Sequence, residues 1–223
     1  MRRRELDARK DEKDSILSNK VEFSDRARKL FPVVLAALLG ACANGTVLLN
    51  SERIEQKFGS YGIEVLHSDD GLRRSNLYST ENQQQTCRTY AVVRFSSDID
   101  ASYAALHERV LAGESLGKIF KANGWFVQKK TIHIATVESA QSAPVITQLM
   151  RLSPNRTLAL HIYQLSLRKG EQSFEYATII EAHHPDYLSV EDLRAIYFLD
   201  DANAISAESA SELVRLALVN SDT

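Results

Sequence analysis

Residues 158–168, LALHIYQLSLR, and residues 173–183, SFEYATIIEAH, are joined by the four residues KGEQ at 169–172. Both runs are rich in the aliphatic, β-branched and aromatic side chains that strands favour. The short joint contains Gly170, a residue that suits a tight turn. The two runs therefore predict a β-hairpin, and we expect the rest of the fold to build around it.

Segments before and after this hairpin show similar patterns. Strand-like segments are 62–67, 72–79, 86–95 and 125–137. Helix-like segments are 51–58, with Ser51 as its N-cap and Gly59 as its end, 99–110, 115–122, a short one capped by Ser189, and 206–219. Residues 144–152 fit either a strand or a short helix. Long runs of antiparallel strand signal with inserted helices predict a single α+β domain, with a mostly antiparallel sheet of about six to seven strands packed by a few helices.

The composition excludes several classes of protein. The chain has 223 residues, of which 44% are hydrophobic and 25% are charged, as in an ordinary globular domain. Its net charge of −2 gives no overall basic field that would attract nucleic acid, so we expect no nucleic-acid partner. Two cysteines cannot form a disulfide framework.

The apolar segment from Leu30 to Ala43 reads LFPVVLAALLGACA and contains no charged residue. Arg26, Arg28 and Lys29 precede it. A basic flank, a short apolar core and small residues at its end describe a secretory signal peptide. A helix of this length would cover only about 21 Å of a hydrocarbon layer roughly 30 Å thick.

The segment ends in Leu39-Gly40-Ala41-Cys42. This tetrapeptide resembles the lipobox of bacterial lipoprotein precursors. The resemblance implies that signal peptidase recognises Leu39, Gly40 and Ala41, that the chain is cleaved before Cys42, and that the Cys42 thiol carries acyl chains. It covers only the first forty-five or so residues. In this class, Ala43 after the cysteine implies sorting to the periplasmic face of the outer membrane rather than to the inner membrane.

One alternative is a single-span inner-membrane anchor with an extracytoplasmic domain. Extending the apolar window from Leu30 to Leu49 gives a segment long enough to span a bilayer. The turn-forming pair Asn44-Gly45 falls where such a helix would have to continue, so we favour the lipoprotein. Either account places the bulk of the chain outside the cytoplasm, because the positive charge lies on the amino-terminal side.

These observations give a domain organisation. Residues 1–41 form the lipoprotein signal peptide, 42–50 a short lipidated tether, and 51–223 the single α+β domain. Residues 1–29 are unusually acidic for the start of a signal peptide. We interpret 1–20 either as a translation start assigned too far upstream, with the true start near Val21, or as a disordered charged tail.

Few residues suggest chemistry. His183, His184 and Asp186 are the tightest cluster of ligand-type side chains. Neighbouring histidines on a strand point to opposite faces, so the favoured interpretation is a strand end without catalysis or metal, and no cofactor is expected. We also expect His161 to be an ordinary sheet-face residue and His107 to face solvent. Strict alternation in 86–95 predicts that Cys87 lies on the same face as Thr89 and Ala91, as a buried thiol.

The sequence therefore predicts a lipoprotein of the bacterial cell envelope that has a non-catalytic binding or scaffolding domain. Its expected partners are the lipid bilayer, through the acyl chains on Cys42, and another envelope protein. The rival account is a membrane-tethered hydrolase or ligand-processing enzyme that uses the region of His183, His184 and Asp186. That account requires these side chains to converge in a pocket with a further acid or nucleophile.

Overall fold

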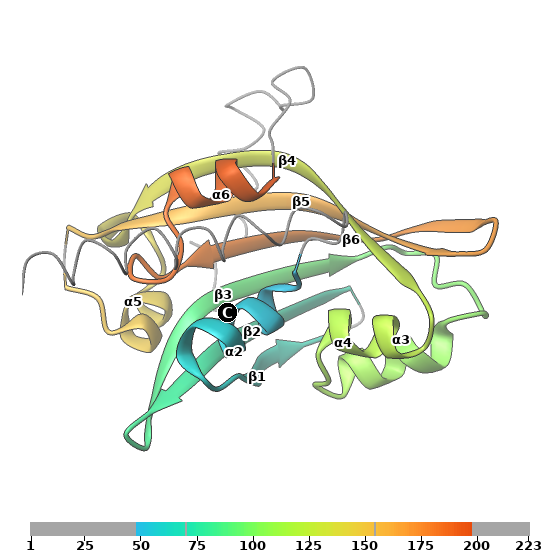
Figure 1. The fold of residues 1–223 in the computed structure, drawn as a ribbon, viewed down its shortest axis with the longest axis horizontal. Helices are drawn as coiled ribbons and strands as arrows, with labels where there is room; N and C mark the ends of the chain where they lie inside the picture. The colour runs from blue at the N-terminus through green and yellow to red at the C-terminus, as the bar shows by residue number, and fades with distance from the viewer. Residues whose placement is uncertain (1–47, 70, 154, 198–223) are drawn as a thin grey trace, which may run out of the picture. The chain divides into compact units, whose positions relative to one another are not determined.

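The computed structural model describes residues 48–69, 71–153 and 155–197. These residues form an α+β domain built on one antiparallel sheet of six strands, in the order β1-β2-β3-β6-β5-β4 (Figure 1). The strands are β1 (Gly62–Ser68), β2 (Leu72–Glu81), β3 (Gln84–Phe95), β4 (Phe126–Glu138), β5 (Thr157–Lys169) and β6 (Gln172–His183). The predicted fold class is confirmed, and the predicted hairpin is β5–β6 at the middle of the sheet.

In the sequence, the described helices precede, separate or follow these strands. They are α2 (Asn50–Phe58), α3 (Ala104–Leu111), α4 (Leu116–Ala122), α5 (Pro144–Met150) and α6 (Val190–Tyr197), with a 3₁₀ turn at Ser139–Gln141. Residues 144–152, for which the sequence left two choices, are mainly the helix α5, which starts with Pro144 at its first position. The predicted helix 206–219 lies outside the described residues.

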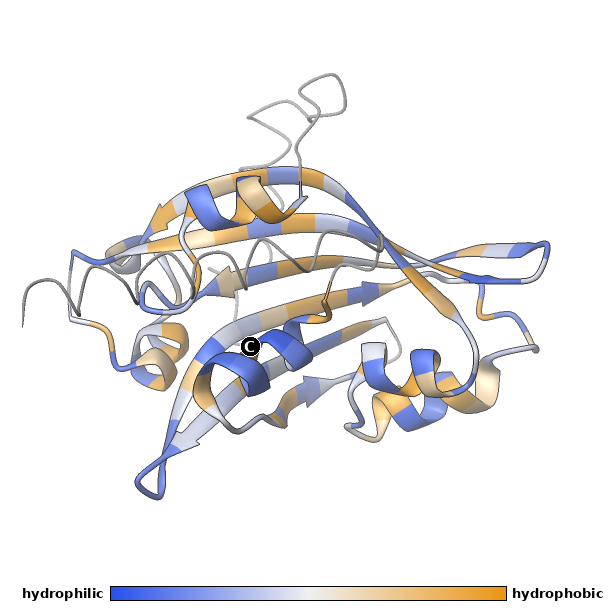
Figure 2. Cartoon of the chain, viewed as in Figure 1, coloured by the Kyte–Doolittle hydropathy of each residue, from blue (hydrophilic) through white to orange (hydrophobic). Residues whose placement is uncertain are grey.

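Successive strand residues point to opposite faces, so the sheet carries a different core on each side. On one face, Tyr90 and Val92 of β3 pack with the buried side chains Ile146 and Met150 of α5. The other face carries Ala91 and is covered by helices that include α2 and α6. In Figure 2, α2 presents mostly hydrophilic residues to the viewer, and its Ile54 is fully buried against the domain.

A β-bulge in β3 changes the predicted faces. Leu77 pairs with Thr89 and Tyr78 with Cys87, which leaves Arg88 as an extra residue without a cross-strand partner. Cys87 therefore lies in the core beneath α5, on the opposite face from Ala91. The strict alternation predicted for 86–95 was wrong at this point, although Cys87 is buried, as expected, at 1% exposure.

Two further local predictions need correction. The N-cap of α2 is Leu49 rather than Ser51, and the Leu49 N–H donates to the Glu52 carboxylate over 2.9 Å. Gly59 ends the helix as predicted, with a left-handed φ of 73°. His107 does not face solvent: it is buried against Phe95 and lies 2.8 Å from the Tyr176 hydroxyl.

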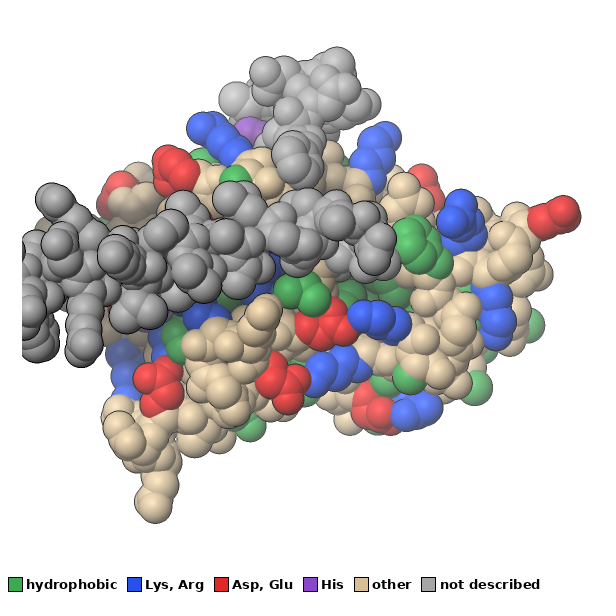
Figure 3. All heavy atoms as spheres, viewed as in Figure 1, with side chains coloured by type: hydrophobic (Ala, Val, Ile, Leu, Met, Phe, Trp, Pro, Cys, Tyr) green, Lys and Arg blue, Asp and Glu red, His purple; other side chains and the backbone are tan. Residues whose placement is uncertain are grey.

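Within the described residues, no helix is both long enough and apolar enough to cross a membrane. On the surface seen in Figure 3, acidic and basic side chains are interspersed over the visible, described atoms. Two ion pairs join α2 to α4, Glu55 with Lys118 and Glu52 with Lys121. This interspersed pattern gives no large field of one sign on the visible face.

Candidate functional site

The three residues singled out at the end of β6 do not converge on one point. His183 is 1% exposed and lies on the face of the sheet that α2 and α6 cover, close to other polar groups. His184 has both ring nitrogens engaged with the main chain, at 3.1 Å from the Met150 carbonyl oxygen and 3.0 Å from the Asp186 N–H. The Asp186 carboxylate is mostly exposed and pairs with Arg156 over 3.0 Å. The structure therefore separates His183 from the other two.

His183 instead meets two residues that the sequence did not connect with it, His161 of β5 and Glu181 of β6. His161 lies directly opposite Glu181 in the sheet, and His183 follows two residues further along β6 on the same face. One potential ligand atom from each side chain lies within 4.8 Å of the others, and the Glu181 carboxylate oxygen Oε2 is 3.7 Å from His183 Nε2. His161, Glu181 and His183 are the His-Glu-His cluster.

A second β-bulge creates this arrangement. Near the turn, Ser166 pairs with Glu175, but further along Leu165 pairs with Ala177, so Tyr176 is the extra residue. Counting back from the turn without this bulge would place His161 opposite Ile180 and would turn Glu181 to the other face. The alternation of β5 and β6 alone could not have revealed the cluster, because a shift of one residue reverses every side chain beyond it.

Each side chain of the cluster is buried, and one of its two polar atoms has a hydrogen-bond partner. His183 Nδ1 lies 2.9 Å from the Thr89 hydroxyl. His161 Nε2 lies 3.0 Å from the hydroxyl of Thr131. The Asn50 side-chain amide donates to Glu181 Oε1 over 3.1 Å and to the Thr89 hydroxyl over 3.1 Å.

The second ring nitrogen of each histidine and the second carboxylate oxygen of Glu181 have no hydrogen-bond partner among the described residues. These atoms are His161 Nδ1, Glu181 Oε2 and His183 Nε2. The three residues are at most 4% exposed, so solvent does not reach them freely. Buried polar atoms normally have a partner, and three such atoms close together indicate a place for a small polar ligand.

The surroundings set the charge of the cluster. Burial, Lys129 and His183 lower the pKa of His161 to about 2. Burial also lowers the pKa of His183 to about 4, although the nearby Glu181 opposes this shift. For Glu181, burial raises the pKa, but Lys129, His183, the Asn50 amide and the nearby Tyr163 hydroxyl outweigh it, so the pKa lies below its usual value. At neutral pH the cluster therefore has two neutral imidazoles and one carboxylate.

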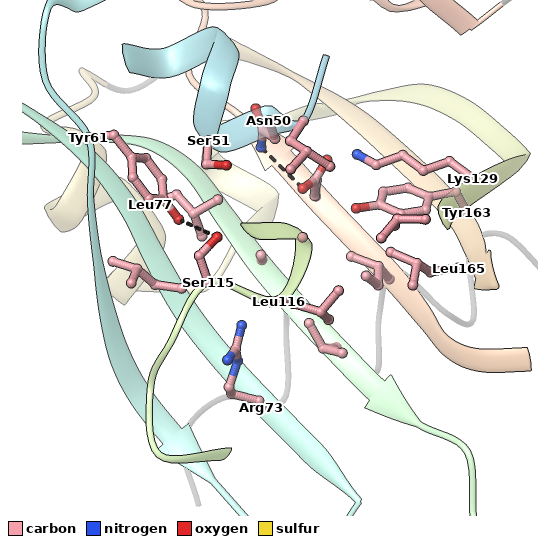
Figure 4. Close-up of a pocket in the computed structure, with 18 residues that line it drawn as sticks. Asn50, Ser51, Tyr61, Arg73, Leu77, Ser115, Leu116, Lys129, Tyr163 and Leu165 are labelled. Atoms are coloured by element: carbon pink, nitrogen blue, oxygen red, sulfur yellow. Dashed lines mark hydrogen bonds between the residues drawn. The ribbon is translucent and has the colours of Figure 1, made fainter. Parts of the chain in front are cut away.

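A small cavity of about 70 Å³ adjoins the cluster beneath α2 and α4. Glu181 forms part of its wall together with Asn50, Lys129 and Tyr163 (Figure 4). The Lys129 ammonium lies 4.4 Å from the centre of the Tyr163 ring. A water molecule occupies about 30 Å³ of liquid, so the cavity has room for one or two waters beside the carboxylate, but not for a drug-sized ligand.

The remaining predicted site residues, Leu39, Gly40, Ala41 and Cys42, lie outside the described residues. The other cysteine, Cys87, is unsuited to nucleophilic chemistry, because burial raises the pKa of its thiol to about 12.

Comparisons with known proteins give no further assignment. No protein-family model matches the sequence. No curated protein matches it either.

Proposed function

We propose that this protein is a lipid-anchored lipoprotein of the bacterial cell envelope, whose α+β domain binds a small ligand or a partner on the extracytoplasmic side. The single observation that carries the proposal is the Leu39-Gly40-Ala41-Cys42 tetrapeptide at the end of an apolar segment with a basic flank. As in the lipoprotein precursors that it resembles, Cys42 is acylated and becomes the first residue of the mature chain. The outer membrane is the favoured location because of Ala43.

The start of the domain supports this organisation. Helix α2 begins at Asn50, eight residues after Cys42, and Asn50 is already tied to the sheet through Glu181 and Thr89. Eight residues extend over at most about 28 Å, so an acylated Cys42 holds the domain close to its membrane. Two or three acyl chains make this attachment stable, since each buried methylene contributes about 0.8 kcal/mol.

The His-Glu-His cluster supports a binding role for the domain. Each of its three buried side chains has one polar atom without a hydrogen-bond partner among the described residues, which suits a small polar ligand. The tethered hydrolase stays a prediction that the arrangement does not favour. His184 is engaged with the main chain and Asp186 with Arg156, so neither is free to act with His183.

Substitution of Cys42 tests the anchor. Cells that express the full chain are labelled with a fatty-acid analogue, and the mass of the amino terminus of the purified protein is measured. We expect the wild-type protein to carry the label and to begin at Cys42, whereas Cys42→Ser loses both the label and the cleavage. Cys87→Ala is the matched control, because it removes the other thiol and should leave labelling and cleavage unchanged.

A label that persists in Cys42→Ser would contradict the proposal. An unlabelled wild-type protein that stays full-length in the membrane fraction, with Cys42→Ser behaving identically, would instead support the single-span anchor.

A further inference from the structure

The His-Glu-His cluster combines the ligand atoms that borderline divalent metals prefer. Two imidazole nitrogens and a carboxylate oxygen come from adjacent strands, with the oxygen Oε2 of Glu181 3.7 Å from His183 Nε2 and all three potential ligand atoms within 4.8 Å. In a tetrahedral zinc site with bonds of 2.0–2.1 Å, neighbouring ligand atoms are about 3.3 Å apart. Small side-chain adjustments would bring the three atoms to this spacing.

The hydrogen bonds behind the cluster have the arrangement that metal ligands require. In bound metal sites, the second nitrogen of a ligating histidine donates to a fixed acceptor, which orients the ring. Here the Thr89 hydroxyl lies 2.9 Å from His183 Nδ1, and the Thr131 hydroxyl lies 3.0 Å from His161 Nε2. The Asn50 amide holds Glu181 Oε1 over 3.1 Å. Two of the atoms left without a partner, Glu181 Oε2 and His183 Nε2, are the pair that lie 3.7 Å apart.

From this geometry we propose that His161, Glu181 and His183 bind one divalent transition-metal ion of the zinc class. Three protein ligands leave the fourth tetrahedral position for a water molecule or an exogenous ligand. The cavity of about 70 Å³ beside Glu181 has room for that ligand.

The protonation states agree with this assignment. Metal ligation requires neutral imidazoles and an ionised carboxylate. Burial keeps the pKa values of His161 and His183 well below neutral, and the pKa of Glu181 is also lowered. The metal-binding forms are therefore already present at neutral pH, and binding should displace few protons from the cluster.

Two basic residues oppose a cation, because the charges of Lys129 and Arg53 both lower the pKa values of His161 and His183. Lys129 also lowers the pKa of Glu181 and lines the same cavity as this carboxylate. Lys129 compensates for the buried carboxylate of Glu181 when no metal is present, and it repels a bound metal. Removing this charge should therefore tighten metal binding, whereas removing a ligand should weaken it. A hydrogen-bonded network without a metal would show neither effect. The two kinds of substitution therefore distinguish a metal site from such a network.

The inference names a ligand class for the proposed binding domain and so rests on that role, but it does not depend on the lipid anchor. The experiment therefore uses the full chain with Cys42→Ser, purified in detergent without a histidine tag. Failure to bind metal would not change the conclusion from fatty-acid labelling, and failure of labelling would not change the conclusion from metal binding.

The test measures the binding of Zn²⁺ and Co²⁺ to this protein after treatment with a chelator. Competition with a chromophoric chelator gives the zinc affinity and the number of ions bound, and the visible spectrum of bound Co²⁺ reports the coordination geometry. We expect one ion per chain, a spectrum typical of four-coordinate Co²⁺, and a raised unfolding temperature with Zn²⁺.

Substitutions assign the ion to the cluster. We expect Glu181→Gln and His183→Gln each to weaken zinc binding by at least about 100-fold. This loss exceeds the 10- to 100-fold loss that is typical when a residue hydrogen-bonded to a metal ligand is replaced. His133→Gln is the matched control: His133 lies on the neighbouring strand opposite Ile162, hence on the other face of the sheet from His161, and its loss should leave affinity unchanged. Lys129→Met should tighten binding at least about tenfold, because it removes a nearby positive charge.

Circular dichroism of the metal-free variants shows whether each one is folded. If Glu181→Gln or His183→Gln fails to fold, Lys129→Met still tests whether the metal binds at the cluster, because this variant leaves every proposed ligand in place. Absence of a stoichiometric ion in the wild-type cluster, unchanged affinity in a folded ligand variant, or weaker binding in Lys129→Met would each overturn the inference.

Discussion

At the scale of single residues, the most consequential feature is that two histidines are buried in their neutral forms. The pKa of His183 is lowered to about 4 and that of His161 to about 2, mainly by burial, with Lys129 adding to both shifts and Glu181 opposing the first. An unfolded histidine titrates near 6.5. Between pH 6.5 and about 4, the unfolded chain therefore binds protons that the folded chain does not.

The sign of the pH dependence follows directly. The contribution of these histidines to stability is fully present above pH 6.5 and is lost as the pH falls toward their folded pKa values. We expect the free energy of unfolding to fall by up to about 1.4 kcal/mol per pH unit for each of the two histidines as the pH decreases from 6.5 to 4.5. Urea unfolding at a series of pH values, in the presence of a chelator, measures this slope.

Substitution separates His183 from the other titrating groups. His183→Gln should reduce the slope by the share of one histidine, whatever its effect on stability at pH 7. The control is His67→Gln, which removes a histidine whose side chain is 44% exposed. A wild-type slope in a folded His183→Gln variant would mean that His183 titrates normally in the native state.

At the scale of elements, the first turn of α2 joins the helix to the sheet. Asn50 is 6% exposed, donates to Glu181 and Thr89, and accepts a hydrogen bond of 2.6 Å from the Tyr187 hydroxyl. An isolated helix of nine residues has little stability of its own, so α2 depends on such tertiary contacts. The same residue also orients the carboxylate of the His-Glu-His cluster.

We expect Asn50→Ala to lower the free energy of unfolding by about 2–4 kcal/mol, because three buried hydrogen-bonding groups each lose one partner. It should also weaken zinc binding by about 10- to 100-fold, as expected for a residue that positions a metal ligand. Gln56→Ala is the control, since Gln56 is exposed on the same helix. Denaturant unfolding and zinc competition measure the two effects. Equal stability of the two variants would show that Asn50 does not fasten the helix.

At the scale of the whole molecule, the proposed attachment to the membrane is hydrophobic rather than electrostatic. The full chain has a net charge of −2, and removal of residues 1–41 takes away more basic than acidic residues, so the anchored protein has no overall attraction for anionic headgroups. Ions at 1 M shorten the screening length to about 3 Å and release proteins held by charge. Acyl chains are not affected in this way.

We therefore expect the protein to stay with isolated membranes in 1 M NaCl and to enter solution when a non-ionic detergent is added. Centrifugation followed by immunoblotting of the pellet and supernatant measures the distribution. In the same experiment, an unrelated peripheral protein held by charge should be released by salt. Release of this protein by salt alone would contradict an acyl anchor.

The sequence by itself determined the α+β class, the central hairpin and the position of most strands and helices. Those features depend on patterns between neighbours along the chain, such as the strand-forming side chains of residues 158–168 and the end of α2 at Gly59. The lipobox resemblance is likewise a local signal, and the prediction drawn from it concerns residues outside the described part of the chain.

Only the tertiary structure decided which side chains meet. The extra residues Arg88 and Tyr176 shift the pairing of β3 with β2 and of β6 with β5 by one position. One shift moves Cys87 to the far face, and the other brings His161 opposite Glu181. A bulge forms where packing on both faces favours it, and its effect on every later pair is invisible to a pattern of alternation. The His-Glu-His cluster is therefore a property of the folded sheet.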